Sequence, residues 1–198
     1  MPKTTPRPAA IAPLLSKPAP QRDAGRTRAA ILRAAQEAFS TRGYSDTGVR
    51  DITAAASVNP ALVSRYFGSK EKLYEAALSA LLDVTLITDL PRDGFGEAVV
   101  NTLTGPREGG RNPLPMMVLA SADPVARAIT DRLLGTLFVE PLARWYGPQR
   151  GMEKAACFSA LASGLTLYRE VYPLAAFGSD WSAETHRWWA NAFQSLID

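Results

Sequence analysis

Apolar residues recur with a helical period along most of this chain, starting near Arg26. The first stripe occupies positions i, i+4, i+7 and i+8, which share one helix face: Ile31, Ala35, Ala38 and Phe39. Gly43 follows the stripe, and glycine commonly ends a helix because it accepts a left-handed backbone. No segment shows the apolar–polar alternation of a half-buried strand. The pattern therefore predicts an all-α protein.

Two short helices separated by a tight break come next. Thr47 is expected to cap the first of them, and its inward residues are Val49, Ile52 and Ala56. The break falls at Ser57 and Val58. Asn59 and Pro60 then supply the cap and first turn of the other helix, where a proline loses no hydrogen bond. The inner edge of that helix is formed by Val63 and Phe67.

Helical patterns continue to the C-terminus. Gly68 ends the third helix, and Ser69 caps a fourth with apolar positions at Leu73, Ala77, Leu81 and Val84. Later helices are expected near residues 93–104, 114–122, 124–146, 150–171 and 181–197. Pro141 should bend or split the helix that contains it, and residues 105–115 form a loop rich in glycine and proline.

Residues 1–24 differ from the rest of the chain because they are rich in proline and contain no acidic residue before Asp23. Such a segment is expected to be a disordered tail with too little apolar surface to fold. It carries four basic residues, Lys3, Arg7, Lys17 and Arg22. The tail is either inert or a basic arm that follows the backbone of DNA.

The net charge of +3 is unevenly distributed. Residues 1–85 carry a net charge of +5 and the remainder −2, which favours a polyanion-binding module joined to a near-neutral body. The chain has one histidine, His186, and one cysteine, Cys157, which is expected to be a small core residue. These two residues cannot build a common zinc site or a catalytic constellation, so neither an enzyme nor a cofactor is expected. No apolar run approaches the ~18 residues of a membrane helix.

Residues 47–67, TGVRDITAAASVNPALVSRYF, have the form of a helix-turn-helix. Six of these residues are expected to face outward: Pro60, Ala61, Leu62, Ser64, Arg65 and Tyr66. A helix face with small side chains in its first turn and polar side chains further along fits the major groove of DNA. Arg65 can pair with guanine, Ser64 can contact several base edges, and Leu62 can touch a thymine methyl group.

Residues 26–84 resemble the N-terminal domain of the TetR family of regulators. The resemblance runs through RAAILRAAQEAFSTRGYSDTGVRDITAAA and SVNPALVSRYFGSKEKLYEAAL. Ser57 stands where the family usually has glycine, Val63 where it usually has leucine, and Ser64 where an aromatic residue is frequent.

The resemblance implies a role for individual DNA-binding residues. Phosphate contacts are expected from Thr47, Tyr66 and Lys70, and base contacts from Pro60, Ala61, Ser64 and Arg65. Lys70 would be helped by the positive end of the fourth helix. Two alternatives stay open, since Arg65 can be an ordinary exposed charge and Tyr66 can be a packing residue.

The resemblance also implies a C-terminal domain that binds a small effector and forms a homodimer through its last two helices. Small and bulky residues at helical spacing are expected at the dimer contact: Ala155, Ser159, Ala162, Thr166, Trp189 and Phe193. An apolar or aromatic effector is expected among Met116, Met117, Leu137, Phe138, Trp145, Tyr168 and Tyr172. Both sets can instead belong to an internal core.

The sequence thus predicts a tail at 1–24, a helix-turn-helix domain at 25–70 and a helical effector and dimerisation domain at 71–198. We expect a cytoplasmic, nucleoid-associated repressor that leaves its operator when an effector binds. A DNA-binding regulator without a small ligand, either an activator or one controlled by a partner protein, is the alternative. The sequence does not identify the operator, the regulated genes or the effector.

Overall fold

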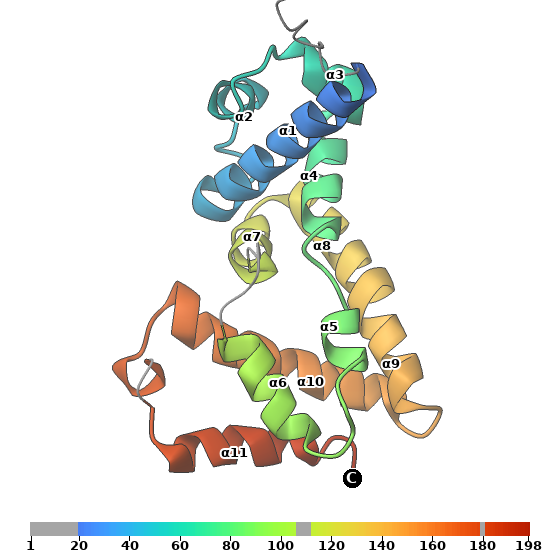
Figure 1. Cartoon of the computed structure of the whole chain (residues 1–198), viewed down its shortest axis with the longest axis vertical. Coiled ribbons are helices and arrows are strands. Elements are labelled where there is room, and N and C mark those ends of the chain that lie inside the picture. Colours follow the sequence, from blue (N-terminus) through green and yellow to red (C-terminus); the bar gives the residue numbers. More distant parts are fainter. Residues whose placement is uncertain (1–19, 106–111, 179–180) are drawn as a thin grey trace, which may run out of the picture.

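The computed structural model describes residues 20–105, 112–178 and 181–198, and all the regular structure in these ranges is helical (Figure 1). The N-terminal elements are α1 (Pro20–Arg42), α2 (Val49–Ala55), α3 (Ala61–Phe67) and α4 (Lys70–Ser79). The middle of the chain forms α5 (Thr85–Thr88), α6 (Phe95–Thr104), α7 (Pro113–Ala120), α8 (Pro124–Leu133), the π-helical segment η1 (Leu134–Val139) and α9 (Glu140–Tyr146). The last elements are α10 (Gly151–Thr166), the π-helical segment η2 (Leu167–Val171), the 3₁₀ turn η3 (Ala175–Phe177) and α11 (Ala183–Gln194). The predicted all-α fold is confirmed.

The elements form two packed groups at opposite ends of the long axis (Figure 1). α2 and α3 lie at one end, while α6, α10 and α11 lie at the other, and α4 leads from the first group toward the second. The series α8, η1 and α9 runs along one side and spans both groups.

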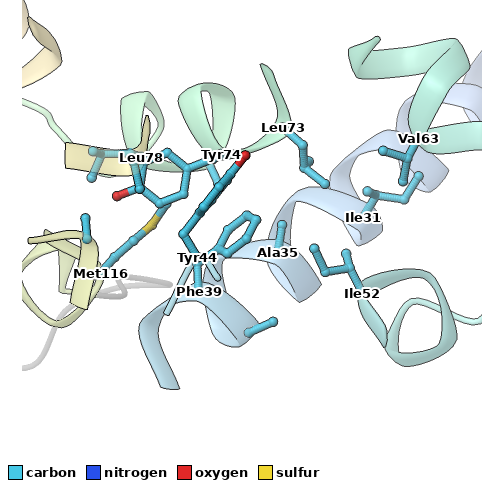
Figure 2. Close-up of a cluster of buried hydrophobic side chains, with 14 of the residues drawn as sticks. Ile31, Ala35, Phe39, Tyr44, Ile52, Val63, Leu73, Tyr74, Leu78 and Met116 are labelled. Carbon is cyan, nitrogen blue, oxygen red and sulfur yellow. The ribbon is translucent and has the colours of Figure 1, made fainter. Parts of the chain in front are cut away.

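The core of the first group includes residues from beyond α4. Phe39, Tyr44 and Tyr74 pack ring against ring, with centroids 5.2–5.9 Å apart. Met116 of α7 reaches the same cluster (Figure 2), and Leu133 of α8 is also part of it. The hydrophobic core therefore crosses residue 70, where the sequence suggested a boundary between domains.

The second core depends on a close approach of α6 and α11. A Cβ atom at Gly96 would lie 1.8 Å from the carbonyl oxygen of Ala190, so any larger residue would push the helices apart. The Gly96 N–H donates to Oε1 of Gln194 at 3.0 Å. Around this contact Phe95, Phe158 and Phe193 are fully buried.

α1 begins earlier than the sequence suggested. The helix starts at Pro20, whereas residues 20–24 were expected to belong to a disordered tail. Proline is compatible with a helix at its first position because the N–H that it lacks would have no partner there. Residues 1–19 lie outside the described residues, and the expectations for them remain predictions.

α4 ends sooner than expected. The apolar pattern suggested a helix through Val84, but α4 stops at Ser79 and a separate short helix follows at Thr85–Thr88. The N–H of Leu81 donates to the carbonyl of Leu78 at 2.9 Å, as in a tightened last turn. Apolar periodicity does not detect this end because the residues beyond it are still apolar.

Pro141 interrupts a long helix, as predicted. The expected helix at 124–146 appears as α8, η1 and α9, with Pro141 in the first turn of α9. A proline inside a helix lacks the N–H donor and crowds the carbonyl four residues earlier, here that of Leu137. The wider π-helical turn before Pro141 accommodates both effects.

Candidate nucleic-acid interface and ligand cavity

The turn between α2 and α3 is held by two backbone hydrogen bonds. The N–H of Ser57 donates to the carbonyl of Ala54 at 3.0 Å, and that of Val58 donates to Thr53 at 2.9 Å. Ser57 has a φ of +54°, in the left-handed region that non-glycine residues rarely occupy. The chain thus makes the usual sharp turn of a helix-turn-helix with a residue that is poorly suited to it.

α3 presents a small and polar face to solvent. Pro60, Ala61, Ser64 and Arg65 are exposed, while Val63 is buried in the core. The N-cap of α3 is Pro60 rather than the expected Asn59, whose side chain accepts the N–H of Ala61 at 2.9 Å just ahead of the helix. Leu62 and Tyr66 were expected to face outward but are half-buried and pack against the core. Only their remaining exposed atoms are available to a ligand.

Thr47 does not occupy the position that the sequence suggested. Its side chain is fully buried, and its hydroxyl lies 2.6 Å from the Gly43 carbonyl and 3.2 Å from that of Ala38. The cap of α2 is Gly48, whose N–H donates to Oδ2 of Asp51 at 3.0 Å. The prediction that Thr47 caps α2 is therefore wrong, and its hydroxyl instead secures the link between α1 and α2.

Lys70 lies in the first turn of α4, close to α3 in sequence and space. Its ammonium group is 4.1 Å from the centroid of the Tyr44 ring, a cation–π contact that orients it. Burial raises the pKa of Tyr44 to about 12, and the nearby carboxylate of Glu71 adds to the effect. The Ser69 hydroxyl caps the helix by accepting the N–H of Lys72 at 3.2 Å. The ammonium and the positive helix end together form a site that attracts anions.

Polar contacts join the group formed by α1 to α4 to α8 and to the loop before α8. The hydroxyl of Ser45 donates to Oδ2 of Asp123 at 2.5 Å and lowers the pKa of that carboxyl group. On α4 and α8, the Tyr74 and Thr130 hydroxyls lie 2.8 Å apart, and Nη2 of Arg132 lies 2.9 Å from Oε1 of Glu75. These contacts tie α8 to α4.

A cavity of about 750 Å³ lies beside the C-terminal end of α4. Its walls come from the connector between α4 and α5 and from α5, α6, α7, η1 and α10, with Gln36 as the contribution of α1. Apolar side chains dominate the wall and include Leu81, Leu86, Leu134 and Phe158. Cavities of this size accommodate drug-sized ligands.

The polar groups of the cavity are neutral apart from one carboxylate. They comprise hydroxyls and amides: Gln36, Asn101, Thr102, Asn112, Ser159, Ser163 and Thr166. Asp83 accepts hydrogen bonds from the backbone and the hydroxyl of Thr85, at 3.0 and 2.6 Å. Among the described lining residues there is no lysine, arginine or histidine, so these residues offer an anion no opposite charge.

The structure brings two of the seven expected pocket residues to the cavity, Met117 and Phe138. Met116 and Leu137 instead pack in or against the N-terminal core, and Trp145 packs on Phe95. Tyr168 and Tyr172 are exposed. The π-helical turns before Pro141 and at the end of α10 rotate side chains away from the directions of a regular helix, which the sequence pattern could not foresee.

The residues expected at a dimer contact face inward. Ala155 and Phe193 are fully buried, Trp189 and Thr166 are nearly so, and Ser159 and Ala162 line the cavity. The exposed stripe of α10 runs beside the stripe that was expected at the dimer contact. It contains Met152, Ala156 and Ala160, which are spaced four residues apart, and Tyr168 lies beyond them. Cys157, expected in the core, is exposed beside this stripe. On α11 the exposed aromatic residue is Trp188.

Two classes of site are not found in the part of the chain that the structure describes. No group of histidine, cysteine and acidic residues there could hold a metal ion. None of its helices is both long and apolar enough to span a bilayer.

Two family models match the chain. One, described as bacterial regulatory proteins of the tetR family, covers residues 31–77. The other, described as a tetracyclin repressor-like C-terminal domain, covers residues 93–197. Between them they include the helix-turn-helix, most of the cavity wall and the exposed face of α10.

Individual proteins are similar over different lengths. The HTH-type transcriptional repressor Rv3405c of Mycobacterium tuberculosis is 49% identical over 53 residues, which are 27% of this chain and 28% of that protein. The crystal structure of the TetR-family regulator SCO0857 from Streptomyces coelicolor has 27% identity and a TM-score of 0.54, over 87% of this chain and 95% of that one. A regulator from Saccharomonospora viridis, crystallised with choline, shares the fold with 18% identity and a TM-score of 0.59, over 86% and 96% of the two chains.

Proposed function

This chain belongs to the TetR family of bacterial regulatory proteins, and from that premise we propose that it is a repressor whose operator affinity is lowered by a small ligand in the cavity beside α4. The family binds operator DNA through a helix-turn-helix and forms dimers. The observation that carries the proposal is the position of the cavity, which directly adjoins the end of the helix that also carries Lys70. A ligand there would touch the element that links the two groups of helices.

The DNA contact is assigned to α3 and the start of α4. The small residues Pro60 and Ala61 let the helix approach the floor of the major groove, and Arg65 can then reach a guanine. Lys70, held on the Tyr44 ring, would then meet a phosphate. This arrangement supports sequence-specific binding because base and phosphate contacts come from separate side chains.

The dimer contact is assigned to the exposed stripe of α10, from Met152 to Ala160, together with Trp188 of α11. These residues are apolar and unusually exposed for their type. A second copy of the chain related by a two-fold axis would cover them and set two recognition helices against two half-sites.

The ligand is expected to be largely apolar and either neutral or cationic. The cavity supplies apolar walls, neutral hydrogen-bonding groups and the Asp83 carboxylate. An anion would lose its hydration without gaining an opposite charge from the described residues of the wall. The choline held by the similar regulator from Saccharomonospora viridis is consistent with this preference.

Ligand and operator would oppose each other through the polar contacts between α4 and α8. Movement at the cavity wall would reach both helices, which are tied by the Tyr74–Thr130 and Glu75–Arg132 contacts. Half-sites must lie about 34–36 Å apart, so a small change in the separation of the two α3 helices weakens binding. Linkage requires ligand and operator to weaken each other by the same factor, typically ~5–150-fold.

The test begins with selection of an operator from a random duplex pool by the full-length protein. Neutral and cationic aromatic compounds are then titrated with and without that operator, and operator affinity is measured with and without each compound. We expect a near-palindromic site and a compound that shows reciprocal weakening. Binding of equal strength to any sequence at about 200 mM salt would contradict specific regulation. Tight compound binding that leaves operator affinity unchanged would contradict control by the cavity.

A further inference from the structure

Of the described residues of α1, only Gln36 lines the cavity. Its side chain is only 7% exposed, and it stands between apolar neighbours on the inward side of the helix. A glutamine in such a position is unusual because burying an amide is unfavourable unless its hydrogen bonds are formed. The amide therefore needs partners, and the structure supplies only part of them.

One partner is the end of α4. Nε2 of Gln36 donates to the carbonyl oxygen of Ala77 at 3.2 Å, across the boundary between α1 and α4. The Leu81 N–H, which would meet that carbonyl in a continuing helix, bonds to Leu78 instead. Gln36 thus satisfies a carbonyl freed where α4 ends, at the point where the chain enters the cavity wall.

The other half of the amide has no partner. Among the described residues no donor reaches Oε1 of Gln36, and the fully enclosed polar atoms without a partner are the hydroxyls of Ser40 and Tyr146. The Gln36 oxygen is therefore not sealed inside protein, and the open space beside this side chain is the cavity. An acceptor that has no partner on the wall of a cavity is a recognition point for a donor on a ligand.

We propose that Gln36 is the polar anchor of the effector, and that the effector carries an N–H or O–H donor that bonds to its amide oxygen. This rests on the proposed function of the cavity as a ligand site. The bound molecule contacts the DNA-binding group itself, through α1, as well as the connector that follows α4. A change in the orientation of the amide also changes its bond to Ala77, so occupancy is felt at the end of α4.

The test uses two fluorescent probes that differ in one hydrogen-bond donor, 2-naphthol and 2-methoxynaphthalene. Their dissociation constants are measured for the wild-type chain, for Gln36→Met and for Thr102→Val. Methionine matches the length of glutamine without its hydrogen bonds. Thr102 is another cavity residue, and its hydroxyl already donates to Ala98 at 2.8 Å. Valine at this position therefore removes a second polar group of the wall while keeping its shape.

In Gln36→Met we expect the preference for the donor-bearing probe over its methyl ether to fall about fivefold, the worth of one net hydrogen bond. Binding of 2-methoxynaphthalene should change less than twofold, and Thr102→Val should keep the wild-type preference. An unchanged preference in Gln36→Met, or a fall in preference that appears in Thr102→Val instead, overturns the role of Gln36 while leaving the cavity a ligand site. If neither probe binds the wild-type chain, the ligand function of the cavity fails, and the anchor with it.

A second variant tests the acceptor from the opposite direction. Gln36→Glu, like Gln36→Met, gives up the donor to the Ala77 carbonyl, but it keeps an acceptor at the same position and strengthens it with charge. Circular dichroism shows whether each variant is folded before its probe affinities are compared. We expect the preference of Gln36→Glu for 2-naphthol to rise above that of the wild-type chain. A preference that is unchanged or lower contradicts the proposal whether or not Gln36→Met folds.

Discussion

Ser57 shows how a single residue can keep a required turn at a cost in stability. Its φ of +54° places its Cβ close to a neighbouring carbonyl, a strain that glycine does not have. The turn is nevertheless fixed, because the hydrogen bonds from Ser57 and Val58 tie it to α2 and buried residues lie on both sides. The surrounding core thus imposes the conformation on the residue.

Ser57→Gly should therefore stabilise the protein. Relief of the strain, reduced by the greater freedom of glycine in the unfolded chain, should raise the free energy of unfolding by about 0.5–1 kcal/mol. Urea denaturation followed by circular dichroism would show a higher midpoint with the same slope. Ala56→Gly is the matched control, since Ala56 has an ordinary right-handed backbone and should lose stability. Equal effects of the two changes would mean that Ser57 is not strained.

The sequence alone predicted one helix cap and several exposed positions well, but it did not predict the hydrogen-bond partners of every polar side chain. The cap at Ser69 and the exposed places of Ser64 and Arg65 followed from spacing and residue type. The roles of Thr47 and Gln36 did not, because they depend on carbonyl groups of other helices, at Ala38 of α1 and Ala77 of α4. Such contacts exist only once the helices have packed.

At the scale of elements, we propose that α3 and the start of α4 make different kinds of contact with DNA. α3 carries the side chains that can reach base edges, and α4 begins with a capped, positively charged end that suits phosphate. The two are adjacent because Gly68 ends α3 with a φ of +87° and lets the chain turn at once into α4. Specificity and overall affinity should therefore respond to different residues.

Arg65→Ala and Lys70→Ala test this division. Removal of a guanine contact by Arg65→Ala should cost about 1–3 kcal/mol on the preferred site and relax the choice at one base pair per half-site. Lys70→Ala should weaken all sequences alike and lower the salt slope by about one unit for each phosphate that is no longer neutralised. Arg127→Ala removes an exposed arginine on α8, outside the proposed DNA contact, and should change neither the base preference nor the salt slope. The measurement is the affinity of each variant for a library of operator sequences at several salt concentrations. Identical profiles for Arg65→Ala and Lys70→Ala would refute the assignment of base contacts to one residue and phosphate contacts to the other.

Element boundaries were predictable where a local signal marks them. Gly43, the Ser69 cap and Pro141 end, start or interrupt helices as the sequence indicated. The end of α4 was missed because a distant glutamine satisfies its carbonyl and no glycine or proline marks the place. The early start of α1 has no distinct local signal, because proline is typical both of disordered segments and of the first turn of a helix.

At the scale of the whole molecule, one core joins the DNA-binding helices to α7 and α8, and a second core supports the exposed face of α10 and α11. The cavity lies where these groups meet, with walls from α1 at one side and α10 at the other. Where the helices are regular, sequence periodicity identified their apolar faces, but it could not say whether a face meets another helix, a cavity or a second copy. Ser159 and Ala162 were assigned to a dimer contact and line the cavity, because the stripe that is exposed is the neighbouring one.

The exposed face should be essential to assembly, and Trp188→Glu tests it. Trp188 is 60% exposed on α11, so a charge there should leave the protomer folded but repel a second copy from an apolar contact. We expect sedimentation to show a mass half that of the wild-type chain at micromolar concentration. Operator affinity should fall more than about tenfold, because two recognition helices no longer bind as one unit. Val125→Glu is the control, since Val125 is 46% exposed on α8, outside this face. If both variants kept the wild-type mass and affinity, the copies must meet through another surface, and the separation of the recognition helices would be set there.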